Sequence, residues 1–157
     1  MTTVTWEEFA AEAPELAAAV RARFEAARHH VLATLRSDGA PRVSGTEVQL
    51  RDGELTLGSM YGAVKALDLR RDGRFALHAN PGDGSMTGGD AKVGGIAEEV
   101  VGEELERYAD EGNPPGSFHL FRLRLAEAVL TSLHPDGDRL VIESWRPGEG
   151  VARRERA

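Results

Sequence analysis

The chain has no cysteine, and this absence excludes several kinds of chemistry at once. Without a thiol there is no disulfide bond, no thiolate metal ligand, no iron–sulfur cluster and no cysteine nucleophile. The chain also lacks a run of about 18 or more apolar residues, and its first residues, MTTVTWEEFA, are acidic rather than basic and then apolar. We therefore expect no membrane-spanning segment, no secretory leader and a cytoplasmic location.

Positive charge is scarce. Lysine and arginine number 19 against 26 aspartates and glutamates, which gives a net charge of -7. Nucleic acids and anionic membranes require a dense cationic face, so we expect neither as a partner and favour a small-molecule substrate. The 157 residues, of which 41% are hydrophobic, suit a single domain over residues 1–157.

Local patterns predict helices first and strands afterwards. Thr5 and Glu8 have the spacing of a capping box, and Pro14 to His30 is alanine-rich with helical periodicity, so residues 1–29 form an N-terminal helical segment. The period then changes to two in VLATLRS, PRVSGTEVQL and ELTLGS. Asp38-Gly39 and Asp52-Gly53 separate these runs and favour tight turns, which predicts three antiparallel strands.

The rest of the chain continues this alternation. We expect a short helix over 63–71, strands at RFALHAN, DAKVGGIAEEV, FHLFRLRLAEAVLTSL and DRLVIESW, an acidic helix over 102–110 and a C-terminal tail over 147–157. The glycine-rich loop 81–89 is a candidate lid or site edge. The resulting fold class is mainly β with flanking helices, with six or seven antiparallel strands in a closed or split barrel.

The stretch GSMYGAVKALDLRRDG, residues 58–73, carries the candidate chemistry. Lys65 falls in the first turn of the expected helix, where the helix dipole disfavours a cation by roughly 0.3–1 kcal/mol. A bound anion would explain the placement, because backbone N–H groups, the Ser59 hydroxyl and the Lys65 ammonium would converge on it. Arg42 would reach the same place if its strand pairs with ELTLGS. The alternative is that Lys65 is an ordinary surface lysine.

These segments resemble the flavin-binding core of the pyridoxamine 5′-phosphate oxidase-like family, the FMN-binding split barrels. In that family an arginine opens one strand, a small hydroxyl residue ends the next, and a lysine follows at a helix start. Arg42, Ser59 and Lys65 match these positions. The resemblance implies a six- or seven-stranded antiparallel split β-barrel, with these three residues holding the phosphate of FMN and Val43, Ser44, Gly58 and Met60 lining the cofactor.

The C-terminal motif ESWRPG extends the resemblance. Trp145 matches a tryptophan that reaches the flavin across a dimer interface in the family, which implies a homodimer with the cofactor site between subunits. The alternative for Trp145 is a core or interface aromatic. The end GVARRERA lacks the histidine of true pyridoxamine phosphate oxidases, so we do not expect oxidation of pyridoxamine phosphate. Val64 stands where many members have an arginine, which implies one phosphate contact fewer and weaker binding of FMN.

The leading hypothesis is an FMN- or deazaflavin-dependent oxidoreductase acting on a small organic acceptor, with no catalytic residue assigned. FMN and an 8-hydroxy-5-deazaflavin coenzyme both stay open as cofactors. The alternative is a protein that binds a flavin, a deazaflavin or haem without turnover. The five histidines, at 29, 30, 78, 119 and 134, show no metal-binding spacing. Arg70, Arg71 and Arg74 form either a solvated helix end or a binding site for a longer anionic cofactor tail.

Overall fold

The computed structural model describes residues 1–157. Its helices are α1 (Trp6–Glu12), α2 (Pro14–Glu25), α3 (Val64–Arg71) and α4 (Gly102–Glu106). Its strands are β1 (His30–Leu35), β2 (Pro41–Thr46), β3 (Val48–Arg51), β4 (Glu54–Met60), β5 (Arg74–His78), β6 (Asp90–Val100), β7 (Phe118–Leu133), β8 (Leu140–Arg146) and β9 (Gly150–Arg156). The prediction of a mainly β fold with flanking helices is confirmed.

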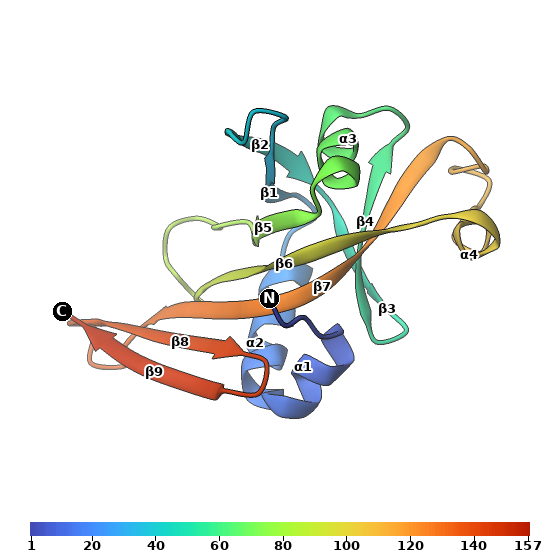
Figure 1. Cartoon of the computed structure of the whole chain (residues 1–157). Helices are drawn as coiled ribbons and strands as arrows, with labels where there is room; N and C mark the ends of the chain where they lie inside the picture. The colour runs from blue at the N-terminus through green and yellow to red at the C-terminus, as the bar shows by residue number, and fades with distance from the viewer.

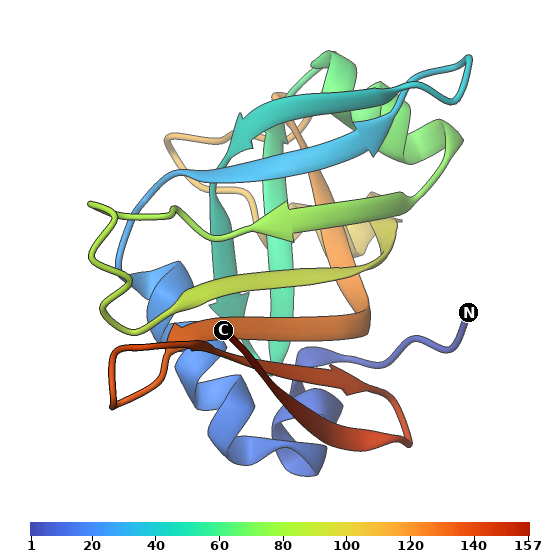
Figure 2. The ribbon, with the colours of Figure 1, turned by 90° about the vertical axis from the view of Figure 1, so that its left-hand side faces the viewer.

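The strands form one antiparallel sheet that curls without closing (Figures 1 and 2). Its order is β2-β1-β5-β6-β7-β4-β3, and β8 and β9 join it through β7. The long strand β7 pairs with β6 along one edge and divides its other edge between two partners. Residues 118–122 pair with β4, whereas residues 128–133 pair with β8. This division makes the barrel a split one.

The strand count is higher than predicted, because two expectations were wrong. PRVSGTEVQL is not one strand: it breaks at Glu47 into β2, which pairs with β1, and β3, which pairs with β4. The expected tail over 147–157 contains β9, which pairs with β8 along its whole length. The basic pattern of this segment hid a strand because β9 is an exposed edge strand, where charged side chains are normal.

The predicted turns and caps are confirmed. The side chain of Thr5 accepts a hydrogen bond from the N–H of Glu8 at 3.1 Å and completes the capping box of α1. Asp52 and Gly53 both have positive φ, 52° and 75°, which is the backbone of the tight hairpin between β3 and β4. Pro14 begins α2, where its missing N–H has no cost.

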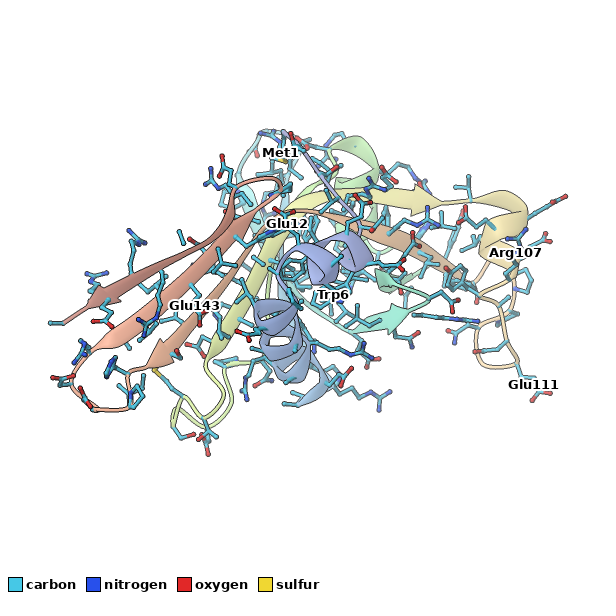
Figure 3. All side chains as sticks on the ribbon, turned by 90° about the horizontal axis from the view of Figure 1, so that it is seen from below. Met1, Trp6, Glu12, Arg107, Glu111 and Glu143 are labelled. Atoms are coloured by element: carbon cyan, nitrogen blue, oxygen red, sulfur yellow. The ribbon has the colours of Figure 1, made fainter.

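A single hydrophobic core lies between the sheet and the first two helices. Seen from below, α1 and α2 cross the middle of the molecule, while the β8–β9 hairpin and the α4 region extend to opposite sides (Figure 3). Trp6 and Phe9 from α1 and Val20 and Phe24 from α2 are buried against apolar residues of the strands.

None of the helices has both the length and the apolar composition that a membrane-spanning helix requires.

Candidate functional site

The site is built where β4 passes into α3. Strand β4 ends at Met60, a turn over residues 61–63 contains Gly62 at φ 75°, and Ala63 is the N-cap of α3. Ala63 has no side-chain oxygen, so no side chain caps the first N–H groups of this helix. Because α3 begins at Val64, Lys65 is its second residue, whereas the expected helix over 63–71 would make it the third. An uncapped helix N-terminus attracts an anion.

A cavity of about 490 Å³ adjoins this helix end. Its volume lies within the range of small-molecule sites, about 300–1,000 Å³. Most of the lining is polar, and the residues are His29, Gly45, Thr46, Glu47, Gln49, Arg51, Thr56, Gly58, Ser59, Met60, Lys65, Tyr108, Asp110, Asn113, Ser117, Phe118 and Leu120. They come from four separate parts of the chain, so the cavity exists only in the folded protein.

Four of the predicted cofactor residues, Gly58, Ser59, Met60 and Lys65, line this cavity. Ser59 is buried, whereas Met60 is largely exposed at the rim. A Cβ placed on Gly58 would meet no atom within 4 Å, so the strand leaves open space at this point. The sequence therefore identified the β4–α3 side of the cavity.

Lys65 reaches across from α3 to β2. Its Nζ donates a hydrogen bond to the backbone carbonyl of Gly45 at 2.8 Å, which leaves the other two ammonium protons without a carboxylate partner. Burial lowers the pKa of Lys65, and the nearby carboxylate of Glu47 opposes this shift. Glu47 itself pairs with Arg28 and His29. The ammonium is half-buried beside the cavity and remains a cation suited to a ligand of negative charge.

Arg42 occupies a different position from the one expected. Strand β2 pairs with β1 and not with β4, so Arg42 does not line the cavity. Its Nε donates to Oδ2 of the buried Asp68 at 2.7 Å. Since Asp68 lies in α3, Arg42 holds this helix against the sheet rather than reaching the ligand space directly.

Val43 and Ser44 also lie outside the cavity lining. Ser44 directly precedes Gly45, which does line the cavity, but successive residues of a strand point to opposite faces. Val43 shares the outer face with Gly45 but lies one position farther along that face, outside the lining. The side chain of Val43 is 70% exposed on the outer face of β2, opposite Ala33 of β1, whereas Ser44 is half-buried and opposite Leu32.

Trp145 lies in the hydrophobic core. Only 1% of it is exposed, and its ring packs on Phe9 with 4.4 Å between centroids. A side chain enclosed by its own subunit cannot cover a cofactor bound elsewhere. Trp145 is therefore a core aromatic, which was the alternative stated for it. We do not include it in the site.

Residues on the far wall of the cavity were not predicted. Tyr108, Asp110, Asn113 and Ser117 come from the segment after α4, and the Tyr108 ring lies under the guanidinium of Arg51, with 5.0 Å from centroid to Cζ. The available signal was the proline- and glycine-rich loop EGNPPGS, since loops of this kind commonly carry binding residues. The glycine-rich sequence of loop 81–89 had favoured that loop for this role instead.

Loop 81–89 lies elsewhere. None of its residues lines the cavity, and Arg23 of α2 donates to the carbonyl of Thr87 at 2.8 Å. A Cβ on Gly88 would touch the same arginine side chain. The loop is therefore held against α2 and does not adjoin this cavity.

The arginines after Lys65 are not free for an anionic tail. Arg70 pairs with Glu99, Arg71 with Asp68, and Arg74 with Asp72. The last pair lowers the pKa of Asp72 to about 2, chiefly through hydrogen bonds from Arg74. Each of these three cations already has a carboxylate partner.

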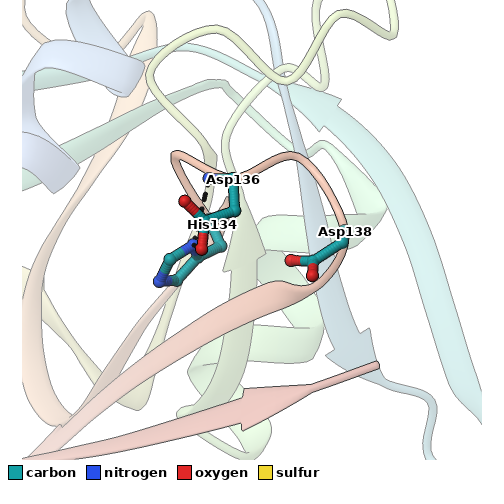
Figure 4. A group of neighbouring side chains, drawn as sticks. All are labelled: His134, Asp136 and Asp138. Atoms are coloured by element: carbon teal, nitrogen blue, oxygen red, sulfur yellow. Dashed lines mark hydrogen bonds and ion pairs between the residues drawn. The ribbon is translucent and has the colours of Figure 1, made fainter.

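The hairpin between β7 and β8 contains three side chains of the types that can bind a metal ion. His134, Asp136 and Asp138 lie close together there (Figure 4). The guanidinium of Arg139 is 2.7 Å from Asp138, 3.4 Å from Asp136 and 2.9 Å from Nε2 of His134. Because a cation already occupies the centre of this group, we interpret it as an ion-paired turn.

Comparison with solved structures places these features in a known fold. The matches include PhzG from Burkholderia lata, in complex with tetrahydrophenazine-1-carboxylic acid, with a TM-score of 0.65, 16% identity and coverage of 90% of this chain and 88% of that one. A pyridoxamine 5′-phosphate oxidase-related FMN-binding protein from Nostoc punctiforme has a TM-score of 0.64 and 12% identity over 92% and 96% of the two chains.

A third neighbour is HutZ, the haem storage protein from Vibrio cholerae, with a TM-score of 0.53, 16% identity and coverage of 71% and 88%. A scan against family models and a search of curated proteins found no match. The structural neighbours confirm the predicted split-barrel fold. They include the kind of FMN-binding protein that the sequence resembles.

Proposed function

We propose that this protein binds the phosphate of FMN or of a deazaflavin coenzyme at the Lys65 end of the cavity. The observation that supports this proposal is that Lys65, Ser59 and the uncapped N-terminus of α3 adjoin one cavity, whose volume suits a small molecule. An ammonium, a hydroxyl and free N–H groups form a donor set that fits a phosphate. The open space at Gly58 then takes the adjoining part of the cofactor.

The cofactor supplies the redox chemistry, which in flavins and deazaflavins is hydride transfer. The protein's residues bind and orient it. Met60 and Phe118 add apolar surface beside the polar phosphate end, while Gln49 and Thr56 offer hydrogen bonds farther along β3 and β4. We propose that the protein is an oxidoreductase acting on a small organic acceptor, because the cavity has room and polar groups beyond those needed for phosphate.

The first experiment is the absorption spectrum of the purified protein, followed by titration with FMN, riboflavin and a deazaflavin. FMN should bind more tightly than riboflavin, which lacks the phosphate. Lys65→Ala should weaken FMN binding by about 1–3 kcal/mol, the contribution of a charge-assisted hydrogen bond. Equal affinities of wild type and variant for FMN would contradict the phosphate site.

Lys92→Ala is the matched control, because Lys92 is the other lysine of the chain and is exposed on β6 away from the cavity. It removes the same charge from the molecule as a whole, so it tests whether a loss of affinity is local. We expect Lys92→Ala to bind FMN as the wild type does.

A second candidate function is binding without turnover, including haem binding. HutZ is described as a haem storage protein and shares the fold, and His29 is the only histidine that lines the cavity. A neutral imidazole is a common axial ligand of haem iron. A Soret band that is lost in His29→Ala would favour this function. Reoxidation of reduced FMN by an acceptor would favour the oxidoreductase.

We also propose that the protein is a homodimer with the cavity beside the subunit interface. The outer face of β1 and β2 is apolar, because the register places Val31 opposite Gly45, Ala33 opposite Val43 and Leu35 opposite Pro41. Val31 and Val43 are 40% and 70% exposed, although both are hydrophobic. Gly45 belongs both to this face and to the cavity lining, so a second copy docked here would adjoin the cofactor.

A further inference from the structure

A buried histidine supports the turn that leads into the phosphate end of the cavity. His119 is 5% exposed and lies on β7 directly opposite Ser59 of β4. Its Nε2 accepts a hydrogen bond from the backbone N–H of Gly62 at 3.0 Å. Gly62 is the middle residue of the turn between β4 and α3, and Lys65 follows three residues later. The imidazole therefore contacts the backbone that determines where α3 begins.

This hydrogen bond assigns the protonation state of the ring. An imidazole nitrogen that accepts from an N–H carries no proton, so neutral His119 has its proton on Nδ1. Nδ1 lies 3.5 Å from Oε1 of Glu99, which is the acceptor available to it. Protonation would add a hydrogen to Nε2. Two donors would then face each other, and the bond to Gly62 would be lost.

Charged and titratable groups face His119 from each neighbouring element. Glu99 comes from β6, Arg70 from α3 and Tyr61 from the turn itself. Hydrogen bonds from Arg70 lower the pKa of Glu99 despite its partial burial, and so favour the ionised carboxylate. The Tyr61 ring stacks on the imidazole, with 5.0 Å between centroids and 18° between planes. The guanidinium of Arg70 lies 3.3 Å from Nδ1 of His119.

We propose that His119 is a positioning residue for the phosphate end of the cavity: the neutral ring holds the turn at Gly62, and the protonated ring releases it. Cofactor affinity then falls as the solution becomes acidic. The inference deepens the proposed function and rests on it, since the affected ligand is the phosphate-bearing cofactor. The residues that touch that ligand are Lys65 and Ser59, and His119 acts through the backbone between them.

Two variants separate the hydrogen bond from the space that the ring fills. His119→Gln offers an amide oxygen near the position of Nε2 and has no proton to gain in this pH range. His119→Phe retains an aromatic ring against Tyr61 and has no acceptor. At neutral pH we expect His119→Gln to bind FMN within about twofold of the wild type, and His119→Phe to bind about tenfold more weakly, the effect of one lost hydrogen bond.

The decisive measurement is FMN affinity between about pH 5 and 8, where histidine titrates. The phosphate of FMN also titrates near pH 6, as phosphate monoesters do, and this contributes equally to every variant. The wild type should therefore lose about fivefold to tenfold more affinity than His119→Gln as the pH falls. Coinciding pH profiles of the wild type and His119→Gln would overturn the proposal.

A ligand-free measurement keeps the two proposals distinguishable. The protection of the Gly62 amide proton, that is, its exchange rate relative to the intrinsic rate at the same pH, should fall in the wild type once His119 is protonated, and the same amide in His119→Gln should show no such step. If FMN does not bind at any pH but the Gly62 amide responds in this way, the proposed function fails and the role of His119 in holding the turn stands. If the amide does not respond, His119 does not hold the turn, whatever FMN does.

Discussion

At the scale of single residues, Asp68 anchors the helix that presents Lys65. Its carboxylate is 2% exposed and accepts hydrogen bonds from Thr34 at 2.8 Å, Arg42 at 2.7 Å and Arg71 at 2.9 Å. Burial would raise the pKa of this carboxyl, but the hydrogen bonds from Arg42, Arg71 and Thr34 outweigh it and hold the pKa below its ordinary value. The hydrogen bond from Thr34 thus ties α3 to β1, and the ion pair with Arg42 ties it to β2.

Replacing Asp68 by Asn should destabilise the protein by about 2–4 kcal/mol, because it leaves the partly buried Arg42 without its anion. Urea unfolding monitored by circular dichroism measures the loss. Asp138→Asn removes an exposed carboxylate that also pairs with an arginine, and it should leave the midpoint almost unchanged. Equal losses in the two variants would show that Asp68 is not an anchor.

The same carboxylate gives a pH dependence. Because the folded-state pKa of Asp68 is lower than its unfolded value, its contribution to stability is fully present above the unfolded pKa and is lost as pH falls through the folded pKa. The unfolding free energy of the wild type should therefore decline below about pH 4 more steeply than that of Asp68→Asn. Parallel curves for the two proteins in acid would contradict this assignment.

At the scale of elements, α3 is joined to the β1–β2 hairpin at three levels. Lys65 donates to the carbonyl of Gly45 in β2, Arg42 of β2 reaches Asp68, and Arg71 donates to the carbonyl of Leu35 in β1 at 2.8 Å. Each of these contacts uses a long side chain to bind a group on the neighbouring element. A helix of eight residues is too short to be stable alone, so these contacts hold its N-terminus beside the cavity.

The pairing of β6 with β7 contains a bulge in β7. Gly94 and Gly95 are adjacent in β6, but their partners Glu127 and Leu125 are separated by Ala126, which is the extra residue. An extra residue of this kind increases the local twist, which lets β7 diverge toward β4 at one end and β8 at the other. Gly95 lies so close to β7 that an added Cβ would be 1.9 Å from the carbonyl oxygen of Arg124.

Gly95→Ala should therefore destabilise the protein by about 3 kcal/mol, since backbone rather than a flexible side chain must move. Gly94→Ala is the matched control: its Cβ would meet the Glu127 side chain at 3.3 Å and the carbonyl of Phe75 at 3.4 Å, which are smaller overlaps. We expect a loss of less than about 1 kcal/mol for this variant. Thermal unfolding of both proteins measures the difference, and similar midpoints would mean that the bulge tolerates a methyl group.

At the scale of the whole molecule, the cavity collects segments that are far apart in the chain. The β4–α3 junction supplies the cationic end, β2 and β3 supply one wall, and the segment from Tyr108 to Phe118 supplies the other. The apolar outer face of β1 and β2 lies next to this cavity through Gly45. If a second subunit covers that face, assembly and cofactor binding are coupled.

Val43→Glu tests this coupling. A carboxylate at an exposed, apolar strand position should disrupt the proposed homodimer, because burying an unpaired charge is costly. Sedimentation should report a monomer, and FMN affinity should fall with it. Val101→Glu changes another exposed valine, outside the β1–β2 face, and should leave the assembly intact. A variant Val43→Glu that sediments and binds FMN as the wild type does would contradict the proposed interface.

Local features were predictable because neighbours in sequence determine them. The Thr5 cap, the Asp52-Gly53 turn and the spacing of Ser59 and Lys65 depend on interactions within a few residues. The same reasoning failed for Arg42, because strand pairing decides whether that residue reaches β4, and β2 pairs with β1 instead.

By itself, the sequence determined a mainly antiparallel fold, with a lysine at a helix start after a serine that ends a strand. Only the tertiary structure decided that Trp145 is enclosed with Phe9, that Tyr108 and Asn113 face the cavity, and that His119 supports Gly62. The reason is physical. Hydrogen bonding and backbone preferences act locally, whereas burial and the shape of a cavity depend on which distant segments pack together.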